Sequence, residues 1–184
     1  MKNITIALSL SGIAFLLGAL GYVAISSLLG AAFRGLFRMF MYHEAHPFQY
    51  IGIVAIVFGI IGSVWVRYFG ATEEWKRWLS ILLCIMLTIL VSSVPGGILW
   101  KIHDMQAGYF TEGARFWSDL WWGAKEGLLV GWLVILIPIP YNLIGVLIGG
   151  LLLHKLPSVI SQITNQGRTS GCYQQATRHE SEAS

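Results

Sequence analysis

The stretch Leu128–Leu153, LLVGWLVILIPIPYNLIGVLIGGLLL, runs for 26 residues without a charged side chain. A transmembrane helix needs about 20 apolar residues to cross a hydrocarbon core of about 30 Å, so this stretch is long enough to span a membrane. Pro138 and Pro140 interrupt it, because a proline has no amide hydrogen for the carbonyl four residues earlier. In hydrocarbon such carbonyls must be satisfied by neighbouring protein or enclosed water, so this helix needs partners.

Three earlier apolar stretches, at about residues 4–29, 50–69 and 79–100, can supply those partners. Hydrophobic residues make up 55% of the chain and charged residues 11%, against about 25% charged residues in a soluble domain. We therefore predict an all-α, polytopic integral membrane protein with four transmembrane helices over residues 1–156. Residues 157–184 form a polar tail with too few apolar residues to pack, so we expect it to be disordered.

The first apolar stretch has an alternative interpretation as a cleaved signal peptide, because Ala19-Leu20-Gly21 places small residues at a cleavage spacing. The apolar run continues past this position to Leu29, which is longer than the apolar region of a typical signal peptide. We therefore favour a transmembrane span.

Two segments between the spans are expected to be amphipathic helices at the membrane surface. In residues 33–41, aromatic and aliphatic residues recur at helical spacing, while Arg34 and Arg38 lie on another face. The alternative is that the first span simply continues as a tilted helix. In residues 116–124, an apolar side faces a largely charged one; here the alternative is an aromatic belt without a helix.

The orientation rests on the basic residues near the span ends. With both termini inside, six lie on the inner side and five on the outer side. The inner set is Lys2, Arg67, Lys76, Arg77, Lys155 and Arg168, and the outer set is Arg34, Arg38, Lys101, Arg115 and Lys125. This small excess favours cytoplasmic termini, and the short loops are typical of a bacterial plasma membrane. A re-entrant fourth segment would instead place the C-terminus outside.

The spans lack the charged residues that mark ion pathways and proton relays in membranes. Apart from Arg67 at the rim of the second span, none contains Asp, Glu, Lys, Arg or His. This argues against a proton-coupled transporter. No Ser/His/Asp set, Cys-x-x-Cys pair or glycine-rich phosphate loop occurs in the sequence, so neither an enzyme nor a bound cofactor is expected.

Three histidines form the candidate metal site: His43 and His46 before the second span, and His103 after the third. An even number of crossings between these loops places them on the same side of the membrane. Imidazole is a common ligand of zinc and similar ions. The same residues could instead sense pH or simply be polar residues of the membrane surface.

Small residues four positions apart occur in every span, and such pairs let transmembrane helices approach closely. The packing positions we single out are Gly59, Gly131, Gly145 and Gly149. They are expected to serve packing within one bundle, while some face a homo-oligomer or another membrane protein.

These patterns favour a non-enzymatic accessory, assembly or regulatory protein that lies in the lipid bilayer, acts through helix–helix contacts and binds no nucleic acid. The alternative is a small oligomeric channel or facilitator whose polar constriction is formed by Pro138, Pro140 and Asn142. Asn142 could equally bond a carbonyl freed by the prolines.

Overall fold

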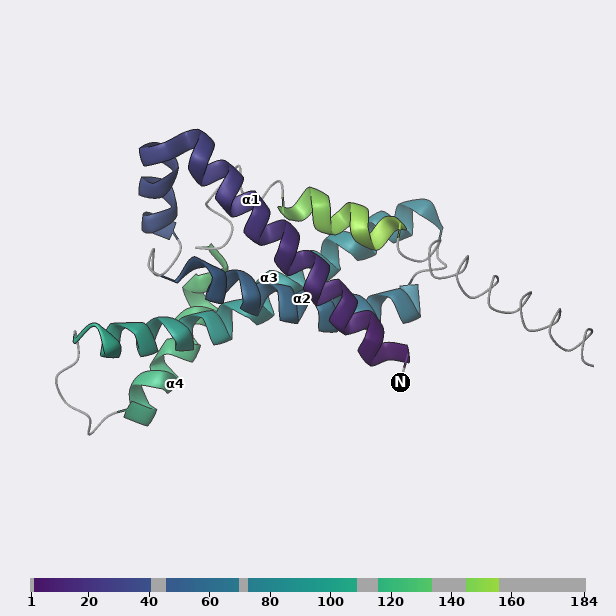
Figure 1. Ribbon diagram of the computed structural model, residues 1–184. Helices are drawn as coiled ribbons and strands as arrows, with labels where there is room; N and C mark the ends of the chain where they lie inside the picture. The colour runs from purple at the N-terminus through teal and green to yellow at the C-terminus, as the bar shows by residue number, and fades with distance from the viewer. Residues whose placement is uncertain (1, 41–45, 70–72, 109–115, 134–144, 156–184) are drawn as a thin grey trace, which may run out of the picture.

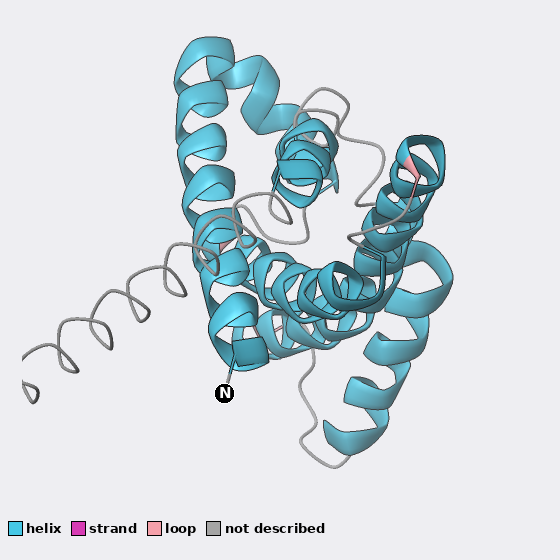
Figure 2. Cartoon of the chain, turned by 90° about the vertical axis from the view of Figure 1, so that its right-hand side faces the viewer, coloured by secondary structure: helices cyan, strands magenta, loops and turns pink. Residues whose placement is uncertain are grey.

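The computed structural model describes residues 2–40, 46–69, 73–108, 116–133 and 145–155, with backbone only at residues 2–3, 29–40 and 69. All regular elements in these ranges are helices, and none of the described residues forms a strand (Figure 2). Three helices are long and apolar enough to cross a membrane: α1 (Lys2–Phe40), α2 (Pro47–Phe69) and α3 (Glu74–Gln106). The chain is therefore an all-α protein with the helices of a membrane protein.

Three shorter elements follow, namely α4 (Phe116–Glu126), a π-helical turn η2 (Gly127–Gly131) and a helix over Gly145–Lys155. The first confirms the helix predicted at residues 116–124. The other two are the described parts of the predicted fourth span. Pro138, Pro140 and Asn142 lie outside the described residues.

The three long helices run antiparallel in sequence order (Figure 1). Tyr22 of α1 meets Phe48 at the start of α2, with ring centroids 5.8 Å apart. At the other end of α2, the indole Nε1 of Trp65 donates a hydrogen bond to Ser80 Oγ at 2.9 Å. We call the end where α2 finishes and α3 begins the Trp78 end, and the opposite end, where α3 finishes, the His103 end.

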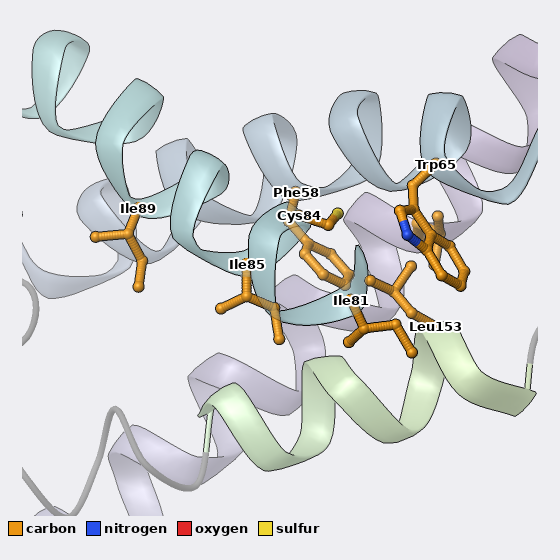
Figure 3. Packing of buried hydrophobic residues seen from close by; sticks show 8 residues of the cluster. Phe58, Trp65, Ile81, Cys84, Ile85, Ile89 and Leu153 are labelled. Atoms are coloured by element: carbon orange, nitrogen blue, oxygen red, sulfur yellow. The ribbon is translucent and has the colours of Figure 1, made fainter. Parts of the chain in front are cut away.

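The hydrophobic core lies toward the Trp78 end, where α1, α2, α3 and the Gly145–Lys155 helix meet (Figure 3). Leu153 is fully buried in this cluster beside Trp65 and Ile81. Gly62 makes room for it, because a Cβ there would lie 3.1 Å from Leu10 Cδ1 and 3.3 Å from Leu153 Cδ2. The start of α1 and the end of the Gly145–Lys155 helix therefore lie together at the Trp78 end.

Toward the His103 end, α4 and η2 run back along α3 with almost no space between the backbones. A Cβ added to Gly97 of α3 would overlap Gly123 O and lie 2.9 Å from Gly127 Cα. A Cβ at Gly127 would overlap the carbonyl oxygen of Ser93. Lys101 Nζ and Glu126 Oε2 form an ion pair at 3.1 Å beside this crossing. Glycine is required at these positions because the neighbouring atoms belong to backbone that cannot rotate away.

The helices are longer than the apolar stretches that predict them. α3 stays helical through Pro95, although a proline removes one backbone hydrogen bond of a helix, and it continues to Gln106. Near Pro95, two hydroxyl groups donate hydrogen bonds to carbonyls of the preceding turn. Ser92 Oγ bonds Thr88 O and Ser93 Oγ bonds Leu90 O, each at 2.7 Å.

α1 is likewise one helix to Phe40, so the predicted first span and the predicted surface segment belong to the same helix. It bends in its C-terminal part (Figure 1). Ser26 Oγ and Ser27 Oγ both bond Val23 O, at 3.0 and 2.8 Å, and such back-bonding to the preceding turn bends helices. The side chains of the predicted amphipathic face after residue 32 are not described, so that prediction is untested.

Adjacent glycines in α3 provide a matched test of the α3–α4 crossing. We expect Gly97→Ala to lower stability by about 1–3 kcal/mol, because the new methyl group would force two backbones apart. Gly96→Ala should leave stability unchanged or slightly raised, since a Cβ at Gly96 meets no atom within 4 Å. Thermal unfolding of both variants in the same detergent measures the difference, and equal melting temperatures would contradict the crossing.

Candidate polar site at the His103 end

The candidate site forms where α2 begins and α3 ends. Pro47 is the first residue of α2, a position that tolerates proline because the first amides of a helix have no intrahelical partner. His46 lies just before the helix, and its carbonyl accepts a hydrogen bond from the Gln49 amide at 3.1 Å. The first turn of α2 therefore carries Gln49 and Tyr50 to the last turn of α3, which holds His103.

His103 is the centre of the site and is only 5% exposed. Its Nε2 lies 2.9 Å from Gln49 Oε1, and its Nδ1 lies 3.3 Å from Tyr50 Oη. An amide oxygen only accepts hydrogen bonds, so Nε2 carries the hydrogen and donates it, while neutral Nδ1 accepts from the tyrosine hydroxyl. This pattern satisfies both nitrogens of a neutral imidazole at the boundary between the two helices.

Two aromatic contacts fix the plane of the His103 ring. The ring of His46 lies against it, with centroids 4.3 Å apart and planes tilted by 35°. Tyr50, which is also buried, meets His103 edge to face with a centroid distance of 5.9 Å. The arrangement resembles a packed polar cap more than an open pocket.

The structure brings together two of the three histidines predicted as a metal site, His46 and His103. Both nitrogens of His103 are engaged in hydrogen bonds, with Gln49 and Tyr50. The described residues contain no group of three His, Cys, Asp or Glu side chains able to hold a metal ion. His43 lies outside the described residues, so the three-histidine site stays a prediction.

The glycines singled out for packing have different surroundings. A Cβ at Gly59 would overlap Ser11 Oγ of α1, and one at Gly149 would lie 3.5 Å from the Phe58 ring. Gly131 is buried, whereas a Cβ at Gly145 would meet no atom of the described residues within 4 Å. Gly59 and Gly149 thus pack within the chain, while Gly145 has open space beside it.

Sequence reasoning overlooked the close contact between α3 and α4, which uses Gly97 and Gly123. The signal was present, since Gly123, Gly127 and Gly131 are spaced by four residues. It also overlooked Gln49 and Tyr50 as partners of His103. Their positions three and four residues after His46 place them on one helical face with it.

Comparison of the chain with protein-family models, curated proteins and solved structures gave no significant match. Its function must therefore be inferred from its own residues.

The hydrogen bond from Tyr50 can be tested by removing one oxygen atom. We expect Tyr50→Phe to lower stability by about 1 kcal/mol, because the buried Nδ1 of His103 loses its donor. The control is Tyr68→Phe, which removes the same oxygen atom from a side chain that is 66% exposed. The ring that lies 5.5 Å from the Arg67 guanidinium is kept in this variant. Denaturant unfolding in detergent should distinguish the variants, and identical midpoints would remove the assigned bond.

Proposed function

We propose that the chain is a non-enzymatic, multi-pass membrane protein that associates with another membrane protein through the outward face of α1. α1 is the peripheral helix of the fold. In the most apolar 18-residue stretch of each helix, 6% of α1 is buried, against 39% of α2 and 50% of α3. The inner side of α1 is held by α2, where Ala7 and Ser11 contact Gly59.

The outward side of α1 carries the feature that supports this proposal. Thr5, Ser9 and Gly12 are exposed there at spacings of four and three residues, which places them on one helical face. Leu8 and Leu16 flank them and are 68% and 61% exposed. Small residues let another helix approach closely where lipid provides no hydrophobic drive for association. A transmembrane helix of a partner protein fits this face.

Two contacts support a fourth crossing by residues 128–153. η2 lies beside Ser93 and Gly97, in the half of α3 nearer the His103 end. The Gly145–Lys155 helix lies beside Ile81 and Ile85, because a Cβ at Gly150 would be 3.8 and 4.0 Å from those side chains. We infer that the intervening chain passes from the His103 end to the Trp78 end as the fourth transmembrane segment.

The charges at the two ends favour a cytoplasmic Trp78 end. Among described side chains, four basic residues lie there, namely Arg67, Lys76, Arg77 and Lys155, whereas Lys101 and Lys125 lie at the His103 end. Cytoplasmic loops carry the excess of Lys and Arg. We therefore propose a cell-membrane protein, of the bacterial plasma membrane type, with both termini in the cytoplasm.

Two glycines with open space beside them allow a test of the association face. We expect Gly12→Ile to abolish co-purification of the partner with protein tagged after Ser184, because the larger side chain blocks close approach while leaving α1–α2 packing intact. Gly145→Ile adds the same volume at another open position and should retain the partner. Native mass spectrometry in mild detergent identifies the partner or a second copy of the chain. Retention by the Gly12 variant would exclude this face.

The fourth crossing can be tested with cysteine labelling. Cys84 is buried, so an impermeant maleimide should leave it unmodified, and Cys172 in the tail serves as a natural reporter. With four crossings, Cys172 and a Glu74→Cys reporter label from the same side, and an Ala107→Cys reporter labels from the opposite side. Labelling of Cys172 together with Ala107→Cys would show a re-entrant segment instead.

A further inference from the structure

Two short segments meet through stacked rings at the Trp78 end. The imidazole of His154 lies over the indole of Trp78, with centroids 4.9 Å apart and planes inclined by 23°. Arg77 precedes Trp78 and Lys155 follows His154, so the stack brings two cationic residues to the same corner of the bundle. Trp78 remains 46% exposed, so the indole side of this stack lies at the surface of the fold.

His154 has a polar atom that the stack does not use. Its Nε2 is buried, and no hydrogen-bond partner for it occurs within the described parts of the chain. A buried polar atom without a partner is energetically unfavourable, so a ligand that supplies the partner would be bound favourably. When Nε2 carries hydrogen, the required ligand atom is an oxygen acceptor.

The charge around this corner favours an anion. Four basic and two acidic side chains are described at the Trp78 end: Arg67, Lys76, Arg77 and Lys155, with Glu73 and Glu74. Glu73 is engaged by Lys76 at 2.8 Å. The His103 end has the opposite balance, with two basic and three acidic described side chains: Lys101 and Lys125, with Asp104, Asp119 and Glu126.

The position of this corner suits the headgroup layer of a membrane. Trp75 and Tyr68 are 65% and 66% exposed beside it, and aromatic residues of this kind lie at the membrane–water interface. Each has a cation close to its ring, with Lys76 Nζ 5.8 Å from the Trp75 centroid. Phosphate groups of the adjacent leaflet lie at this depth, and basic pockets between transmembrane helices bind such headgroups.

We propose that the corner formed by Arg77, Trp78, His154 and Lys155 binds a phosphate group, supplied by an anionic phospholipid of the surrounding leaflet. The Nε2 hydrogen of His154 is donated to a phosphate oxygen, and the adjacent cations balance its charge. Trp78 holds the imidazole in place. A bound phospholipid would join the start of α3 to the Gly145–Lys155 helix, two segments far apart in the sequence.

The test measures lipid binding to the detergent-purified full-length chain by native mass spectrometry, with phosphatidylglycerol and phosphatidylcholine as probes. His154→Phe preserves a flat ring against Trp78 and removes both nitrogens. Lys155→Gln removes a charge from an exposed position. Lys125→Gln is the matched control at the other end, where Lys125 is exposed and lies 4.9 Å from the Trp122 ring centroid. A parallel titration with inorganic phosphate distinguishes a lipid headgroup from a free anion.

We expect the native chain to bind phosphatidylglycerol in preference to phosphatidylcholine. His154→Phe should weaken that binding about tenfold, as expected for one charge-assisted hydrogen bond. Lys155→Gln should weaken it as well, and Lys125→Gln should not. Binding of inorganic phosphate that depends on His154 would support the site and identify a free anion as its ligand. Equal binding of the two lipids, or unchanged binding in both the His154 and Lys155 variants, would overturn the proposal.

Discussion

The contact of backbone with backbone at Gly97, Gly123 and Gly127 is the constraint on which the rest of this half of the fold depends. Lipid solvates apolar side chains as well as a neighbouring helix does, so helices in a membrane associate through close packing and polar contacts. Here the missing side chains allow α4 and η2 to lie directly on α3, and the Lys101–Glu126 ion pair adds a polar contact beside them. The direction in which η2 leaves α4 along α3 follows from this crossing.

α3 has two sides with different physical roles. Its inner side carries buried hydroxyl groups, and Thr88, Ser92 and Ser93 each bond a carbonyl of their own helix. They therefore need no acceptor from a neighbour, and η2 lies directly against the backbone at Ser93. The outer side presents large aliphatic residues, with an apolar groove of about 280 Å³ between Leu83, Leu87 and Trp132. The hydroxyl groups of α3 therefore lie against the rest of the protein, and its large aliphatic side chains form the outer surface.

Much of the architecture could be predicted from the sequence, because apolar length and the absence of charge are local properties. The three long helices and the helix at residues 116–124 follow from such patterns. The hydrogen bonds from His103 to Gln49 and Tyr50 could not be predicted, since they depend on how far α2 and α3 are shifted along each other. Helicity through Pro95 and the role of Gly123 likewise depend on neighbours far away in the sequence. Three predictions concern residues outside the described ranges. They are the metal ligand His43, the constriction at Pro138, Pro140 and Asn142, and the polar tail 157–184.

The tryptophans near the two ends of α3 relate the protein to bilayer thickness. Trp78 and Trp100 are 22 helical steps apart, a rise of about 33 Å at 1.5 Å per residue. Lys101 Nζ lies 5.5 Å from the Trp100 ring centroid, which places a charge at that boundary. Because the glycine crossing joins α3 to α4, a thinner bilayer could not be matched by tilting α3 alone. Either α3 and α4 would tilt together, or the lipid around them would thicken. Hydrophobic mismatch therefore acts on both helices at once.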